Sequence, residues 1–162
     1  MSEDPSIYNI AREIVRAADS APKEYKKSLP GITPLSKPFW QATTQHKFLL
    51  QKCTSCGTFQ WYPKPWCIEC GSRNLEWTQA SGLGEVYSFT IIREVVQNSP
   101  AFEEDLPYAL AEIDLKEGPR FVAQLKDVKP EEAEVGMRVK VTFIDATPEI
   151  SIPKFERAEE ER

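Results

Sequence analysis

The sequence predicts a mainly β protein with three parts: an N-terminal helical segment, a metal ribbon and a C-terminal five-stranded barrel. All four cysteines lie between residues 53 and 70, in two Cys-x2-Cys pairs. From Gly82 onward, β-branched and aromatic residues recur in short runs separated by turn residues, a pattern typical of strands. The predicted parts are a helical arm with a proline-rich connector (1–47), the ribbon (48–80), the barrel (81–158) and a charged tail (159–162).

The composition indicates a globular chain without a membrane span. Of its 162 residues, 41% are hydrophobic and 28% are charged, which is typical of a folded domain. No stretch approaches the roughly 18 consecutive apolar residues that a spanning helix needs. The start of the chain, Met1 to Pro5, is acidic and no apolar run follows it, so no secretory signal is predicted. We therefore expect a cytoplasmic protein with no membrane partner.

The N-terminal arm combines a predicted helix with a connector. Over residues 6–19, apolar side chains recur at i, i+3, i+4, i+7, i+8 and i+11, which places them on one face of a helix. This helix packs on its own domain or docks on another chain, and the pattern favours neither. Residues 20–38 contain four prolines and resist regular structure.

A second short helix is predicted to begin at Ser36 or Lys37 and to end near Gln45. A proline is tolerated in a first helical turn, where its missing N–H is not needed. On such a helix Phe39 and Trp40 would point inward.

The cysteine spacing is typical of a four-thiolate metal site. A pair two residues apart turns back on itself, so that two pairs supply a tetrahedron of sulfur ligands, as Zn²⁺ prefers. Each pair is followed by a glycine, Gly57 or Gly71, which permits a tight turn. We predict a structural Zn²⁺ ion that stabilises a ribbon with little core of its own. The predicted ligands are Cys53, Cys56, Cys67 and Cys70.

Cysteine pairs of this kind have three other uses. Two disulfides require an oxidising compartment, and no export signal is predicted. A redox Cys-x-x-Cys motif needs only one pair. An iron site for electron transfer uses the same four ligands, and the sequence does not separate it from zinc.

Aromatic residues and prolines crowd the nine residues between the two cysteine pairs. Phe59, Trp61 and Tyr62 fit a minimal core for the ribbon. A second interpretation is an exposed aromatic platform for a base, an adenine ring or a partner protein, and it stays open for Trp61 and Trp66.

The C-terminal half predicts a small closed barrel of the oligonucleotide/oligosaccharide-binding type, the OB-fold. Gly118 and Pro119 mark a tight turn between the second and third strands, and 131–135 forms one helical turn before the fourth. Five short strands with one helical turn in this position suit the OB-fold. The strands are predicted at 85–93, 108–115, 121–125, 138–144 and 150–155.

The residue types argue against an enzyme. The sequence contains no Gly-rich phosphate loop and no Ser-His-Asp set, and its one histidine, His46, is expected on the surface. With four cysteine ligands, the metal has no open position for a catalytic water. The chain alone is therefore predicted to be non-catalytic.

The charge distribution weighs against nucleic-acid binding, which an OB-fold with a ribbon otherwise suggests. Residues 1–52 carry a net charge of +3 and residues 81–162 carry −8, whereas phosphate neutralisation needs a basic groove. Nucleic-acid binding is kept as the alternative. Basic residues gathered on one barrel face would suit a single phosphorylated ligand better than a polymer; they are Arg93, Arg120, Lys126, Arg138 and Lys140.

These motifs resemble a known family, the zinc-ribbon/OB-fold proteins associated with acyl-CoA metabolism. The resemblance covers about residues 36–157, and both cysteine pairs occur in the expected order with the strand that follows them. The matching stretches are Pro38 to Trp40, Phe48 to Gly57 (FLLQKCTSCG), Tyr62 to Gly71 (YPKPWCIECG), Leu75 to Trp77, Ser81 to Thr90 (SGLGEVYSFT), Gly136-Met137 and Ile152 to Phe155 (IPKF).

The resemblance implies a helical N-terminal segment, a rubredoxin-like zinc ribbon and an OB-fold. It also implies a non-catalytic scaffold that binds a thiolase or thiolase-like condensing enzyme, with hydroxymethylglutaryl-CoA synthase as a further partner, and that helps bind or channel CoA thioesters. Some relatives instead accompany an enoyl-CoA hydratase or an aldolase. Candidate contacts of a CoA or acyl-CoA ligand are Trp61, Trp66, Arg93 and Lys126.

Overall fold

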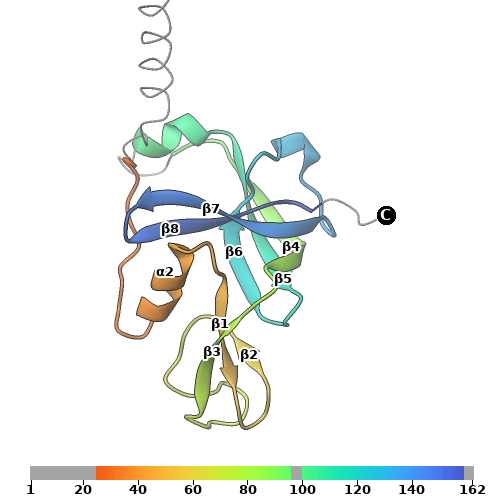
Figure 1. Cartoon of the computed structure of the whole chain (residues 1–162). Coiled ribbons are helices and arrows are strands. Elements are labelled where there is room, and N and C mark those ends of the chain that lie inside the picture. Colours follow the sequence, from red (N-terminus) through yellow and green to blue (C-terminus); the bar gives the residue numbers. More distant parts are fainter. Residues whose placement is uncertain (1–24, 96–99, 159–162) are drawn as a thin grey trace, which may run out of the picture.

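Two antiparallel sheets dominate the molecule, a three-stranded sheet in the ribbon and a five-stranded sheet in the barrel (Figure 1). The computed structural model describes residues 25–95 and 100–158, so the helix predicted at 6–19 lies outside the described residues. The described elements are α2 (Lys37–Thr43), β1 (Leu49–Cys53), β2 (Phe59–Gln60), β3 (Leu75–Gln79), β4 (Leu83–Ile92), the 3-10 turn η1 (Pro100–Asp105), β5 (Tyr108–Leu115), β6 (Arg120–Gln124), η2 (Pro130–Glu132), β7 (Arg138–Thr147) and β8 (Ile150–Arg157).

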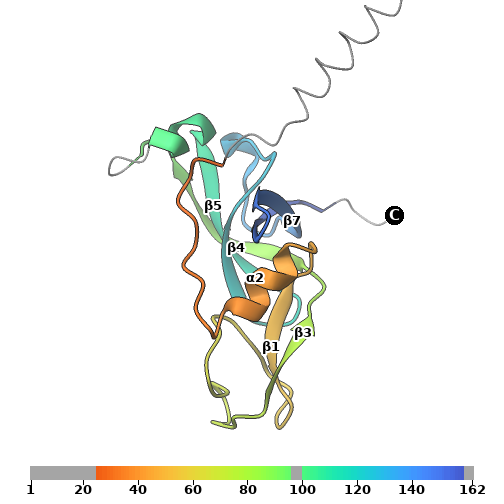
Figure 2. The same ribbon diagram turned by 60° about the vertical axis from the view of Figure 1, so that its left-hand side comes forward.

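The connector and α2 lie along one side of the molecule, between the top of the barrel and the ribbon (Figure 2). As predicted, a proline stands in the first turn of α2, and Phe39 is fully buried. The helix ends at Thr43, slightly earlier than expected. The chain closes this end by placing His46 at a left-handed φ of 53°, so that the Lys47 amide donates back to the Ala42 carbonyl at 3.0 Å. Within the described residues, no helix is both long and apolar enough to cross a membrane.

The ribbon sheet has the order β2-β1-β3. β1 pairs with β3 along its full length, from Leu49 opposite Gln79 to Cys53 opposite Leu75. β2 adds two residues on the other side of β1. The sheet therefore places the first cysteine at the end of its central strand.

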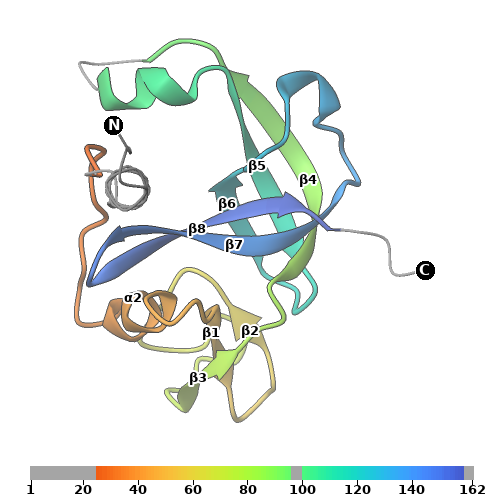
Figure 3. The same ribbon diagram turned by 45° about the horizontal axis from the view of Figure 1, so that its top comes forward.

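The five-stranded sheet has the order β6-β5-β4-β7-β8, which confirms the OB-fold. The expectation of a fully closed barrel is wrong, because β6 and β8 meet at only one parallel bridge, between Leu125 and Phe155. Side chains from α2 and the ribbon pack here instead: Phe48 lies 5.1 Å from Phe121 on β6 and 5.9 Å from Phe155 on β8, centroid to centroid. In Figure 3, α2 and the ribbon lie on the β7–β8 side of the barrel.

The predicted barrel strands are all observed, with small differences in length. β7 extends past the predicted end to Thr147 through an irregularity at Asp145, and the predicted helical turn at 131–135 is the shorter Pro130–Glu132. The 3-10 turn Pro100–Asp105 was not predicted. At the entry to β4, Gly82 has a φ of +71°, and a Cβ there would overlap the side chain of Val141.

Candidate metal centre and binding surfaces

Two matching turns present the four cysteines. In the first, the Gly57 amide donates to the Cys53 carbonyl at 2.8 Å, and in the second the Gly71 amide donates to the Cys67 carbonyl at 3.0 Å. Both glycines have positive φ, +81° and +72°, which a side chain would strain. The backbone itself therefore turns each pair of sulfurs toward the other pair.

The four sulfurs lie within 4.8 Å of one another. The Sγ atoms of Cys53 and Cys70 are 3.6 Å apart, and so are those of Cys56 and Cys67. A tetrahedral Zn²⁺ with bonds of about 2.3 Å needs sulfurs roughly 3.8 Å apart. All four are free thiols, two buried and two exposed, so the donor set fits a structural zinc ion.

The crowded thiols have strongly separated acidities. The hydroxyl and the backbone amide of Thr58 lower the pKa of Cys56 to about 6. The Ser72 amide also lowers the pKa of Cys70, but other effects outweigh it. The pKa of Cys70 is raised to about 12 by the hydrogen bond with Cys56, by burial and by the other two thiols. Neighbouring thiolates repel one another, and a divalent cation offsets that repulsion.

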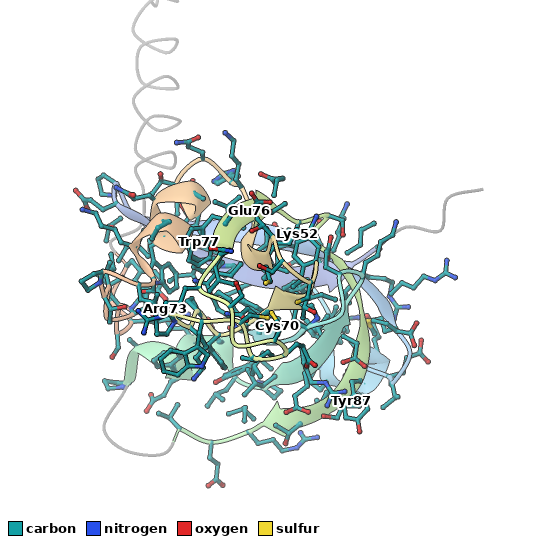
Figure 4. All side chains as sticks on the ribbon, turned by 90° about the horizontal axis from the view of Figure 1, so that it is seen from below. Lys52, Cys70, Arg73, Glu76, Trp77 and Tyr87 are labelled. Atoms are coloured by element: carbon teal, nitrogen blue, oxygen red, sulfur yellow. The ribbon has the colours of Figure 1, made fainter. Side chains whose placement is uncertain are left out.

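Polar side chains hold the cysteine turns and the linker in place. The hydroxyls of Ser55 and Ser72 hydrogen-bond across the two turns at 2.9 Å. Below them, the buried Gln60 donates to Gln51 at 2.8 Å and accepts from the Ile68 amide at 3.1 Å. Figure 4 shows the ribbon end from below. In this view Cys70 lies between Arg73 and the residues Lys52 and Glu76, which are cross-strand neighbours on β1 and β3.

The linker and the second cysteine turn carry three exposed apolar side chains. Tyr62, Trp66 and Ile68 are 61%, 51% and 57% exposed, and we call these three residues the ribbon patch. Trp61 is different, because its ring is half-buried 4.6 Å from Phe39 and 4.9 Å from Phe121. The sequence alone does not separate the two tryptophans and does not predict the exposure of Ile68. The available signal for Ile68 is its position between two cysteines.

The four candidate ligand contacts come from opposite ends of the molecule. Trp61 and Trp66 belong to the ribbon, whereas Arg93 follows the last residue of β4. β4 begins beside the ribbon and spans ten residues, or about 30 Å. Lys126 follows β6 and forms an ion pair with Asp127 at 2.9 Å. Its charge is therefore already balanced by a neighbouring carboxylate.

One serine, one aspartate and the histidine do meet, but not as a catalytic triad. His46 and Ser151 both hydrogen-bond to Oδ1 of Asp145, at 2.8 and 2.6 Å. The Ser151 hydroxyl is thus tied to the carboxylate and not to the imidazole, and the residue is buried. A triad nucleophile needs a hydrogen bond to the imidazole and access to substrate, and this arrangement provides neither.

The outward face of β4, β5 and β6, a face that many OB-folds use for oligonucleotides, is acidic here. Arg120 lies 3.4 Å above the ring of Tyr87 and donates to Asp114 at 2.7 Å. Glu112 lies beside Arg120 at 3.9 Å. The guanidinium is therefore already neutralised, which disfavours a phosphate backbone on this face.

A four-cysteine ribbon followed by a five-stranded OB sheet defines a zinc-ribbon/OB-fold protein. Two family models match consecutive parts of the chain: "ChsH2, rubredoxin-like zinc ribbon domain" matches residues 40–76, and "ChsH2, C-terminal OB-fold domain" matches residues 77–143. In a solved structure described as "Ltp2-ChsH2(DUF35) aldolase", one chain is 33% identical with a TM-score of 0.71, and the match covers 80% of this chain and 98% of that one. The chain belongs to this ChsH2/DUF35 family, as the sequence resemblance indicated.

Two curated relatives extend the comparison. A "Probable enoyl-CoA hydratase alpha subunit" of Thermomonospora curvata is 36% identical over 121 residues, and a "DUF35 domain-containing scaffold protein" of Pyrococcus furiosus is 50% identical over 82 residues. These matches cover 74% and 49% of this chain. The chain spans 37% of the first relative's length and 57% of the second's.

Proposed function

We propose that the chain is a non-catalytic scaffold subunit that binds an enzyme acting on CoA thioesters. The observation that carries this proposal is the ribbon patch, whose residues are exposed on the linker and the second cysteine turn. The buried Gln51 and Gln60 hold these two segments through hydrogen bonds from the Lys64 and Ile68 amides. Aromatic residues on a rigid surface are typical anchors of protein interfaces. Among the described residues, the four cysteines form the one metal-competent cluster, and it leaves no open ligand position.

We further propose a structural zinc ion held by Cys53, Cys56, Cys67 and Cys70. When bound, the ion supplies folding free energy and neutralises the thiolates. The chain's own part is to fix the sulfurs, through the tight glycine turns and the Ser55–Ser72 hydrogen bond.

The partner that we favour is a thiolase or thiolase-like condensing enzyme, with hydroxymethylglutaryl-CoA synthase as a further member of the complex. The scaffold name of the Pyrococcus relative supports the scaffold role. The hydratase name of the Thermomonospora relative and the aldolase complex support the alternative, an accessory subunit of a hydratase or aldolase. In both cases the partner's substrate is a CoA thioester.

A CoA or acyl-CoA ligand would meet this chain through Trp61, Trp66, Arg93 and Lys126, as the sequence predicts. Trp66 has the greatest support, because half of its surface is free in the ribbon patch. The half-buried Trp61 would act by holding the linker in place. Replacing Trp66 or Lys126 by Ala is expected to weaken CoA binding, and unchanged affinity in both variants would remove these residues from the ligand site.

The partner assignment is tested by co-expressing the full chain with each candidate enzyme and measuring complex mass by light scattering. A complex with one of the CoA enzymes is expected, and Trp66→Ala with Ile68→Ser should weaken it at least tenfold, as for interface anchors. Val135→Ser is the matched control, because Val135 is an equally exposed apolar residue near η2 on the barrel. Co-purified nucleic acid without any CoA enzyme would support the alternative and overturn the scaffold role.

A further inference from the structure

A hollow of about 500 Å³ lies on the barrel wall where the ends of β4, β5 and β7 meet. These strands lie side by side in the sheet (Figure 1). Leu83 of β4 faces the hollow and is paired with Lys140 of β7, while Glu85 is paired with Arg138 on β7 and with Asp114 on β5. Lys116, just past the end of β5, completes the charged rim.

Among the described residues that line this hollow, three are cations (Lys116, Arg138 and Lys140) and two are carboxylates (Glu85 and Asp114). Within the described parts of the chain, Lys116 and Arg138 form no ion pair, and Lys140 has only Glu156 at 3.4 Å. Asp114 is occupied by Arg120, which donates to it at 2.7 Å. The carboxylate that is left among the described lining residues is Glu85, which is opposite Arg138 in the strand register.

The floor of the hollow is apolar. Leu83 is 41% exposed although it lies in a strand, and the buried Val139 and the backbone of Gly84 lie beside it. The backbone here is fixed by hydrogen bonds from Lys116 to the Leu83 carbonyl at 2.9 Å and from Ala158 to the Arg138 carbonyl at 2.9 Å. A rigid apolar floor with a cationic rim is suited to a ligand that is part apolar and part anionic.

We propose that this hollow binds a phosphorylated small molecule. Its phosphate groups contact Lys116, Arg138 and Lys140, and an apolar or aromatic portion lies on Leu83. Arginine and lysine are the usual partners of phosphate oxygens. Glu85 and Asp114 at one side repel a continuous row of phosphates, so the site takes a single ligand and not a nucleic-acid strand. The site is separate from Trp66 and Lys126 and does not depend on which enzyme the chain accompanies.

The site is tested with the full chain, by following backbone amide shifts on addition of pyrophosphate, ADP or CoA. Shifts are expected at Gly84 and Val139, with ADP binding more tightly than pyrophosphate because of its contact with Leu83. Arg138→Gln should weaken both ligands about tenfold, as expected for a charge-assisted contact. Leu83→Ala should weaken ADP and leave pyrophosphate unchanged.

The matched control is Lys129→Gln, which removes the same charge from an exposed lysine beside η2. Tighter binding of CoA than of ADP identifies a CoA-type ligand, whereas equal binding identifies a nucleotide. Equal loss of affinity in Lys129→Gln and Arg138→Gln would overturn the proposal, because the attraction would then be a general charge effect. Shifts confined to other residues, or no binding at millimolar ligand, would also overturn it. Either failure leaves partner binding through the ribbon patch unaffected.

Discussion

At the scale of single residues, the metal centre depends on the backbone turns that position its four sulfurs as well as on the sulfurs themselves. The amides of Cys53 and Cys67 donate to the carbonyls of Thr58 and Ser72, at 2.9 and 2.7 Å, so that each cysteine turn closes on the residue after its glycine. Cys53 and Cys67 are also buried, and removing either sulfur would leave three ligands and an unfilled space.

Replacing Cys67 by Ser is therefore expected to lose the metal and to lower the melting temperature markedly. A structural zinc ion contributes about 10 kcal/mol or more of apparent binding free energy, which is coupled to folding. Metal content by mass spectrometry and thermal unfolding by circular dichroism measure the two effects. Thr78→Ala on β3 is the control: it removes one exposed hydrogen bond, to Glu76, away from the cysteine turns, and should cost about 1 kcal/mol or less. Loss of metal with an unchanged melting temperature would contradict the structural role.

Gly82 is expected to tolerate no side chain. Its φ of +71° is unfavourable for alanine, and the added Cβ would overlap Val141 on β7. We expect Gly82→Ala to lower the free energy of unfolding by about 2–3 kcal/mol through backbone strain and overpacking. Gly31→Ala is the matched control, because nothing lies within 4 Å of a Cβ at that position. Chemical denaturation of both variants measures the difference in free energy of unfolding. Equal values would show that Val141 on β7 moves aside without destabilising the fold.

The sequence predicted the metal ligands because a Cys-x2-Cys turn is a local feature. It could not separate Trp61 from Trp66, since both stand in the same aromatic linker. Trp61 is half-buried because Phe39 and Phe121, far away in the sequence, lie against its ring. Among the described residues, no aromatic ring packs against Trp66, which is about half exposed. Burial of an aromatic residue in a short linker is decided by tertiary contacts, which spacing does not reveal.

At the scale of elements, the alternation of charged and apolar residues predicted β7 well because, at its start, exposed Arg138 and Lys140 alternate with buried Val139 and half-buried Val141. The same reasoning predicted five barrel strands but not how they close. Closure between β6 and β8 depends on aromatic side chains contributed by α2 and the ribbon, and these lie outside the pattern of either strand. The turn Pro100–Asp105 was missed because it has no buried residue and no periodic face.

The 3-10 turn η1 fixes the connector to the barrel through its last residue, Asp105. Lys27 donates to Asp105 at 2.6 Å, and both side chains are less than 20% exposed. Lys154 of β8 lies 3.8 Å from the same carboxylate, and Gln124 donates to it at 3.4 Å. One aspartate thus joins the connector to two strands of the barrel.

The contact of Asp105 makes stability depend on pH. Burial alone would raise the pKa of Asp105, but the hydrogen bond from Lys27 and the charges of Lys154 and Lys27 lower it below its usual range. A lowered pKa means that this stabilisation is present above about pH 4, the unfolded value, and is lost as the pH falls through the folded value. We expect Asp105→Asn to cost about 2 kcal/mol at pH 7, as for a charge-assisted hydrogen bond.

The measurement is the melting temperature of wild type and variant between pH 7 and pH 2. The gap between them should be largest near neutrality and should close in acid, where the wild-type carboxylate is protonated. The phenols of Tyr25 and Tyr108 also face Asp105, but burial and the aspartate raise the pKa of both, so neither titrates in this range. Glu104→Gln serves as the control and should follow the wild type. A gap that stays constant with pH would contradict the role of the Asp105 charge.

At the scale of the whole molecule, the ribbon and the barrel share one core. The cluster of buried side chains runs from Phe39 and Phe48, before the cysteines, to Phe121 and Phe155 in the barrel. Phe39, Phe48 and Phe155 are almost fully inaccessible to solvent. Because a ribbon of this size has little core of its own, it is stabilised by both the metal and this junction.

A shared core predicts one cooperative unfolding transition, although the chain has two sheets. Removing the metal with a chelator should lower the melting temperature of the barrel as well as that of the ribbon, since the ribbon's end anchors Phe48 against β6 and β8. Phe48→Ala should destabilise both parts together by about 3–5 kcal/mol, the cost of a large cavity in a core. Trp66→Ala, at an exposed aromatic of the same ribbon, should change stability by less than about 0.5 kcal/mol.

Amide exchange followed at Lys52 in the ribbon and at Val141 in the barrel measures the two parts separately. If the barrel amides keep their protection from exchange after chelation, the junction does not couple the two sheets. If ribbon and barrel amides lose protection together, the metal stabilises the barrel as well as the ribbon.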